Sequence, residues 1–123
     1  MSTWDFPHAK VLTVHDGDNA TVEVDMGFDE YKRVSVRLLG MNAIELSQPG
    51  GKEARDNLAT ILPAGTQIAL HSVQWDKFGG RVDGHITLPD GTDLTTLLIR
   101  TGWAAPWDGT GKAPVPAWPR QGT

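Results

Sequence analysis

The 123-residue sequence contains no cysteine, which excludes disulfide bonds and thiolate metal ligands and leaves the redox compartment open. It has no apolar run close to the ~20 residues that a membrane-spanning helix needs. Its first residues carry neither the basic nor the apolar segment of a signal peptide. We therefore expect a cytoplasmic protein with no membrane partner, and we expect a monomer.

Basic residues are also scarce, since 11 Lys and Arg face 15 Asp and Glu for a net charge of −4. Tight sequence-independent binding of nucleic acid depends on phosphate neutralisation by Lys and Arg, so the net charge speaks mildly against it. The net charge does not exclude a local basic cleft. With 39% hydrophobic residues, 14 Gly and 8 Pro, the composition favours a turn-rich β or α+β protein.

The length suits one domain. We expect a leader over residues 1–9, a folded domain over 10–107 and an irregular tail with Pro and Trp over 108–123. Alternating apolar and polar residues predict five strands, at 10–15, 20–26, 31–39, 66–74 and 82–88.

Helical spacing predicts helices over 52–62 and 94–101, the second with Asp93 as its N-cap and Gly102 as its stop. The order is three strands, a helix, two strands and a helix. It predicts a mainly β (α+β) fold with two or three short helices, a five-stranded OB-fold Greek-key barrel. An SH3-like barrel or a split α+β sheet is the alternative.

The third strand and the loop after it carry the main candidate site. Alternation places Arg37 on the outer face of the strand, which breaks at Gly40, and the loop then supplies Asn42 and Glu45. A cation on a rigid strand beside oxygen ligands suits an anionic substrate held next to a hard metal ion. The alternative is a surface arginine followed by a polar turn.

Three more clusters contain residues that could take part in catalysis or binding. Asp16-Gly17-Asp18 follows the first strand and is also a standard hairpin turn. A glycine-bearing loop over 76–81 contains Lys77 and Arg81, and a later segment contains Trp107. Lys77 is alternatively a solvated side chain, and Trp107 alternatively caps the barrel.

Taken in order from about residue 11 to about residue 107, these pieces resemble the staphylococcal-nuclease-like (thermonuclease) family. Its motifs are an Asp-Gly-Asp turn, an Arg-Leu-Leu strand followed by Asp-(Thr/Ala)-Pro-Glu, a Gly-x-Glu-Ala helix start, an Asp-Lys-Tyr-Gly-Arg loop, and an Asp-Gly turn before a Leu-rich helix and Gly-x-Ala. The matching segments here are 16–18, 37–45, 51–54, 76–81 and 90–104.

The resemblance implies a calcium-dependent nuclease that hydrolyses phosphodiester bonds of DNA or RNA. Arg37 and Arg81 would hold the phosphate through paired hydrogen bonds. Glu45 would position or deprotonate the attacking water. The cut would release the 5′ oxygen and leave a 3′-phosphate.

The resemblance also implies the partners of this site. One Ca²⁺ would be bound by Asp18, the Asn42 side chain and the Ala43 carbonyl. Asp16 would lie next to these ligands without binding the ion itself. Lys77 would pair with a neighbouring phosphate, and Trp107 or Trp103 would stack on a base.

The sequence departs from the family pattern at three places, and two of them, Asn42 and the altered glycine loop, favour a second interpretation together with the acidic pI of about 5.4. Asn42 replaces an aspartate, which lowers the expected Ca²⁺ affinity. Ile44 replaces a proline, and the loop Gly79-Gly80-Arg81 has one extra glycine, so that an ungapped match puts Gly80 in the place of the second arginine. The alternative function is a weak or inactive OB-fold module that binds nucleic acid or a protein.

Overall fold

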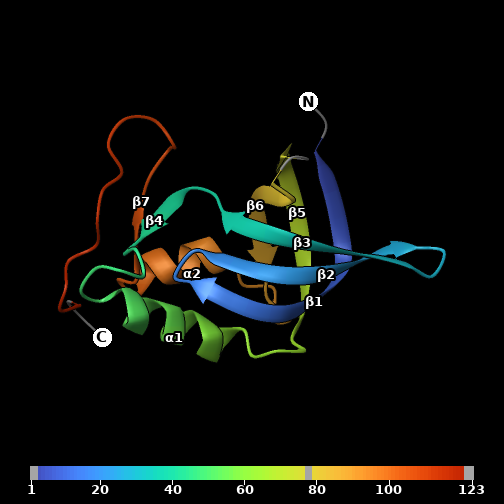
Figure 1. Cartoon of the computed structure of the whole chain (residues 1–123), viewed down its shortest axis with the longest axis horizontal. Coiled ribbons are helices and arrows are strands. Elements are labelled where there is room, and N and C mark those ends of the chain that lie inside the picture. The colour runs from blue at the N-terminus through green and yellow to red at the C-terminus, as the bar shows by residue number, and fades with distance from the viewer. Residues whose placement is uncertain (1–2, 77–78, 121–123) are drawn as a thin grey trace.

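The computed structural model describes residues 3–76 and 79–120 (Figure 1). In chain order its elements are β1 (Trp4–Asp16), β2 (Asn19–Gly27), β3 (Glu30–Leu38), β4 (Met41–Ala43), α1 (Gly51–Ile61), β5 (Gln67–Asp76), β6 (Arg81–Thr87), α2 (Leu94–Arg100) and β7 (Ala104–Pro106). Neither helix is long and apolar enough to cross a bilayer, as judged over the described ranges.

Five strands close into a barrel in the order β1-β2-β3-β6-β5, and β4 pairs with β7 in a separate two-stranded sheet. Neighbours in the barrel are antiparallel except for β3 and β6, which run parallel. The parallel pair and the position of α1 between β3 and β5 are those of the OB fold. The predicted five-stranded OB-fold barrel with short helices is confirmed.

The core follows the predicted alternation. Inward residues of β2 and β3 are buried, while those between them are more exposed. α1 contributes Leu58, and Leu62 just after it packs into the same cluster. Asp93 accepts a hydrogen bond from the backbone N–H of Thr96, so it is the N-cap of α2 as predicted.

The first strand is longer than the sequence pattern indicates. Residues 4–9, expected as part of a leader, belong to β1, and Trp4 pairs with Ser72 while Phe6 pairs with Leu70. The prediction of a loose leader is wrong for this segment because β5 needs a partner to close the barrel. Pro7 hides the alternation and coincides with a register shift, since proline cannot donate to the ladder.

The small β4–β7 sheet was not predicted, because three-residue strands show no periodicity. It joins the chain after Gly40 to the start of the tail, and Asn42 pairs with Ala105. From residue 108 to 120 the tail has neither helix nor strand. Figure 1 shows it arching away from β7 and returning beside the loop that leads into α1.

Candidate functional site

A cavity of about 250 Å³ lies where the β1–β2 turn, the end of β3, the loop after β4 and the start of β6 meet. Asn19 and Ile44 contribute to its lining. The remaining lining residues are all sequence-predicted site residues, namely Asp16, Asp18, Arg37, Asn42, Ala43, Glu45 and Arg81. The fold therefore brings together segments that are separated by up to 65 positions in the chain (81 − 16).

The β1–β2 turn reaches this cavity because of Gly17. A Cβ atom at Gly17 would lie 2.9 Å from the Cβ of Ala43 and 3.0 Å from the Cβ of Ala54. Only glycine lets the turn pack this closely on the β4 strand and on α1. The close contact holds Asp16 and Asp18 beside residue 43.

Register brings Arg37 next to Asp18. Arg37 pairs with Asn19 across β2 and β3, and the Leu38 N–H donates to the Asp18 carbonyl at 2.9 Å. Because the residues on either side of Arg37 are buried in the core, its side chain lies on the outer face of the barrel. The arginine and the acidic turn thus share one surface.

Asp18 is the electrostatically unusual group of the cavity. Burial raises the pKa of its carboxyl from 3.8 to about 7, and the hydrogen bond and negative charge of Asp16 act in the same direction. Arg37 opposes them but does not cancel them. The pair of carboxylates therefore carries unbalanced negative charge that a bound cation would relieve.

Arg81 lines the cavity from the start of β6, and Gly80, with φ of 66°, lies in the turn before it. Its Nε lies 3.0 Å from Oδ1 of Asp83, and its Nη2 donates weakly to Oδ2 at 3.5 Å. The closer contact is an ion pair without hydrogen-bond alignment, since both buried atoms lack a hydrogen-bond partner within the described chain. Asp83 thus orients Arg81 and offsets part of its charge.

Glu45 is exposed on a tightly wound loop. Its carbonyl accepts a hydrogen bond from Gln48 N–H at 2.9 Å, and a Cβ atom at Gly51 would lie 2.0 Å from that carbonyl oxygen. Ile44 is 5% exposed and anchors the loop by burial. The carboxylate of Glu45 is accessible to water and to a substrate.

The side chain of Asn42 makes a contact that no pattern in the sequence predicts. Its Nδ2 donates to the carbonyl of Pro114 in the tail at 2.9 Å. Only the amide nitrogen can donate to a carbonyl, so the assignment of nitrogen and oxygen is fixed. The amide oxygen has no hydrogen-bond partner among the described residues and remains available as a ligand.

The tail also packs on the loop that carries Glu45. A Cβ atom at Gly50 would lie 2.6 Å from the ring of Trp118, which shows how closely the two are packed. Trp118 lies 6.1 Å from Trp103, and Arg120 lies over the Trp103 ring at 4.7 Å and donates to the Thr101 carbonyl at 2.7 Å. The tail is thereby fixed at both the loop and the end of α2.

Trp107 lies beside the site in a neighbouring cavity of about 420 Å³, whose lining also includes Arg37 and Asp83. The Arg37 guanidinium lies 5.8 Å from the centre of the Trp107 ring, within cation–π range. Trp107 is held by hydrogen bonds from its backbone N–H to the Gly40 carbonyl and from Nε1 to the Thr110 carbonyl. Trp103 packs against the core instead, and the predicted residue Lys77 lies outside the described residues.

The donor set is compatible with a hard cation of the calcium type. No group of three or more His, Cys, Asp or Glu side chains suited to a metal ion occurs within residues 3–76 and 79–120. The oxygens gathered here are of mixed kind, with carboxylates of Asp16 and Asp18, the free amide oxygen of Asn42 and a backbone carbonyl at Ala43. Calcium accepts all three kinds, and a bound cation would offset the cost of ionising Asp18, whose pKa is raised mainly by burial and further by Asp16.

Sequence reasoning missed Asp83 and the tail. Asp83 lies at an outward position of β6 and pairs with Arg37 across the parallel β3–β6 ladder. This pairing identifies Asp83 as a neighbour of the site, but only once the order of the strands is known. The hydrogen bond from Asn42 to Pro114 joins residues 72 positions apart, and no local pattern predicts it.

No protein-family model matches this chain. Two curated relatives, from Escherichia coli and Escherichia coli O157:H7, are each named "Uncharacterized endonuclease". Each is 33% identical over 97 residues, which are 79% of this chain and 59% of the relative. The chain thus spans less than two thirds of the length of these relatives and is similar over most of its own length to proteins named as endonucleases.

Proposed function

We propose that this chain is a nuclease of the staphylococcal-nuclease-like type that hydrolyses phosphodiester bonds of DNA or RNA with Ca²⁺ as cofactor. The observation that carries the proposal is the single cavity lined by two arginines, the exposed Glu45 and the acidic turn. The endonuclease name of the two relatives supports the same class of reaction.

In this proposal Arg37 and Arg81 bind the phosphate. Hydrolysis places additional charge on the phosphoryl oxygens, and guanidinium groups can donate paired hydrogen bonds to them. The Nε of Arg81 faces Asp83 and its Nη2 is only weakly engaged, while Nη1 has no partner among residues 3–76 and 79–120, so both Nη atoms can donate to a substrate oxygen. The cation–π contact with the Trp107 ring helps to hold the Arg37 guanidinium in place.

Glu45 acts as the general base. Water attacks phosphorus and its proton passes to the Glu45 carboxylate, while the bond from phosphorus to the 5′ oxygen breaks. The 5′ oxygen takes up a proton from solvent and leaves as a hydroxyl, and the other product keeps a 3′-phosphate. The exposed position of Glu45 on a loop held by Gly51 and Ile44 is consistent with this role.

The proposed cation ligands are Asp18, the amide oxygen of Asn42 and the carbonyl of Ala43, with Asp16 supporting Asp18. When bound, the cation would neutralise charge on the phosphate. Because Asn42 contributes no charge, we expect weaker Ca²⁺ binding than an aspartate would give. Trp107 would stack on a base next to the cleaved bond, and Lys77 would pair with an adjacent phosphate.

The test is digestion of plasmid and single-stranded DNA with Ca²⁺, with chelator, and with a Glu45→Gln variant. We expect chelator to abolish cleavage and Glu45→Gln to lower kcat by about 10²-fold or more. Glu53→Gln is the matched control, since Glu53 lies in the first turn of α1 and does not line the cavity. Metal-independent cleavage, or full activity of Glu45→Gln, would show the proposed site to be wrong.

Two contacts favour a second candidate function, a non-catalytic OB-fold module that binds nucleic acid or a protein. Asp83 already pairs with Arg81, and the tail already engages Asn42. Absence of cleavage in millimolar Ca²⁺ together with retention of the protein on immobilised DNA would favour this module.

A further inference from the structure

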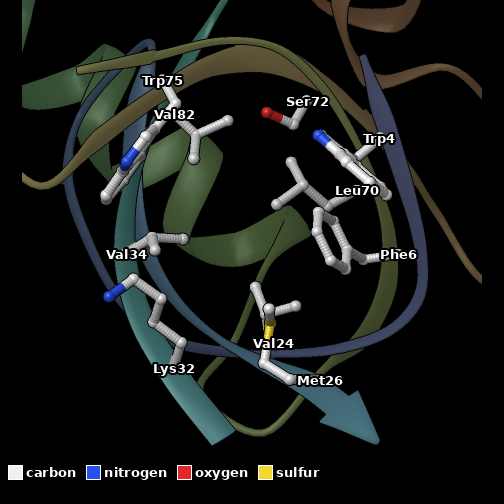
Figure 2. Close-up of a pocket in the computed structure, with 10 residues that line it drawn as sticks. All are labelled: Trp4, Phe6, Val24, Met26, Lys32, Val34, Leu70, Ser72, Trp75 and Val82. Carbon is white, nitrogen blue, oxygen red and sulfur yellow. The ribbon is translucent and has the colours of Figure 1, made fainter. Parts of the chain in front are cut away.

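The end of the barrel opposite the candidate site contains a separate cavity of about 460 Å³ (Figure 2). Trp4 and Phe6, at the beginning of β1, contribute to it, whereas the acidic turn follows the end of the same strand. The described lining residues are Trp4, Phe6, Val24, Met26, Lys32, Val34, Leu70, Ser72, Trp75 and Val82. None of them lines the candidate active site.

The wall of this cavity is mostly apolar and its rim is aromatic. Figure 2 shows Phe6, Leu70 and Val82 around the opening, with Trp4 and Trp75 on opposite sides of it. The two tryptophans are 60% and 41% exposed. Indole rings left in water around a concave apolar surface are typical of a binding site, because covering them is favourable.

Ser72 supplies a polar group without a partner. It is 6% exposed, and its hydroxyl forms no hydrogen bond with any described residue. Figure 2 shows this hydroxyl pointing into the cavity. Its oxygen is not among the fully buried unpaired atoms of the described residues, so the hydroxyl is open to the cavity, and a ligand atom can replace water as its hydrogen-bond partner.

Lys32 gives the cavity a positive charge. It is the charged residue of the described lining, which includes no carboxylate. Its Nζ lies 5.5 Å from the centre of the Trp75 ring, so the ammonium group sits beside the aromatic rim. This combination selects against cations and favours an anionic ligand.

We propose that this barrel end binds a small planar aromatic molecule with one anionic group. The ring system enters between Trp4 and Trp75 and contacts the apolar wall, a polar atom of the ring meets Ser72, and the anion lies near Lys32. The volume lies within the roughly 300–1,000 Å³ of small-molecule sites. Strands surround the opening in Figure 2, which suits a compact ligand rather than an extended chain.

The probe is 8-anilinonaphthalene-1-sulfonate, titrated into the full chain while probe and tryptophan fluorescence are recorded. We expect saturable binding of one molecule per chain, with quenching of tryptophan emission. Trp4→Ala and Lys32→Gln should each weaken binding about fivefold, and Ser72→Ala about threefold. Lys112→Gln, at an exposed tail position outside the cavity, is the matched charge control and should bind as the wild type does.

Two further measurements locate the site and test the charge. N-phenyl-1-naphthylamine lacks the sulfonate, so Lys32→Gln should leave its binding unchanged. Amide shifts in ¹⁵N spectra should change around Trp4, Leu70 and Trp75, and spectra of the variants report that they are folded. Absence of saturable binding, equal loss for both probes in Lys32→Gln, or shifts centred on Arg37 and Glu45 would each overturn the proposal.

Discussion

Replacing Asp18 by asparagine is expected to stabilise the metal-free protein at alkaline pH. In the folded chain the carboxyl is partly buried and lies against Asp16, so its ionised form is disfavoured and its pKa rises to about 7. In its neutral form Asp18 donates a hydrogen bond to Asp16. An asparagine amide at position 18 can donate in the same way without the charge.

The size and sign of the effect follow from the displaced pKa. Each pKa unit corresponds to about 1.4 kcal/mol, so the rise from 3.8 to about 7 bounds the cost of ionised Asp18 at about 4 kcal/mol. Water reaching the partly exposed carboxyl lowers this to about 2 kcal/mol. A raised carboxyl pKa destabilises the folded state above pH 7, and this cost disappears as the pH falls from about 7 towards 3.8.

Urea unfolding in chelator at about pH 8 and about pH 5.5 measures this directly. The free energy of unfolding of Asp18→Asn should exceed that of the wild type by about 2 kcal/mol at the higher pH, and the difference should shrink at the lower pH. Glu30→Gln removes an exposed carboxylate at the start of β3 and should show neither effect. A variant less stable than the wild type at pH 8 would refute the reasoning.

Calcium should reverse the order of stabilities. Ca²⁺ binding adds to the free energy of unfolding of the wild type in proportion to the logarithm of its concentration above Kd. Because a proton on Asp18 competes with the cation, this gain should grow as the pH rises through about 7. Asp18→Asn should gain far less, and an equal gain in both proteins would show that the cation binds elsewhere.

Three other predictions concern the tail and the aromatic neighbour of the site. Gly50 and Gly65 both have φ near 90°, so alanine at either position is strained, and Gly65→Ala should lower the free energy of unfolding by roughly 1 kcal/mol. Gly50→Ala should lower it by at least twice as much in thermal melts, because the new Cβ atom would also clash with the Trp118 ring. Asn42→Asp should bind Ca²⁺ several-fold more tightly by calorimetry while its tail becomes more sensitive to protease, since the tail hydrogen bond is lost. Trp107→Ala should raise the KM for single-stranded DNA about five- to tenfold, with a smaller effect on kcat.

The barrel was predictable because its strands obey a simple alternation. Val22 and Val24 on β2 and Val34 and Val36 on β3 are buried, and they fix both the inward faces and the register. α1 was predictable from the spacing of its buried stripe and from Pro63 and Gly65 after it. These signals are local, and each element shows them within its own residues.

The remaining features depend on contacts between distant segments. Residues 4–9 look like a leader because the reason for their extended structure, the open edge of β5, lies 59 to 68 positions away in the chain. The short strands β4 and β7 each need the other, and Asp83 comes to lie opposite Arg37 only when β6 pairs in parallel with β3. The spacing of residues in the sequence could therefore identify Arg37 and Glu45 as candidates. It could not show which contacts orient the other side chains of the cavity.

Asn42 illustrates how the tail and the cavity depend on one side chain. An aspartate here would offer a charged ligand to a cation, yet its oxygens would face the Pro114 carbonyl, where only a donor is tolerated. The tail that this hydrogen bond holds also carries Trp118 onto Gly50, next to the loop with Glu45. In the proposed mechanism, a residue at position 42 that binds the cation more tightly therefore holds the Glu45 loop less firmly. An aspartate would strengthen the cation site while releasing the segment that packs on the Glu45 loop, so tighter Ca²⁺ binding need not give faster cleavage.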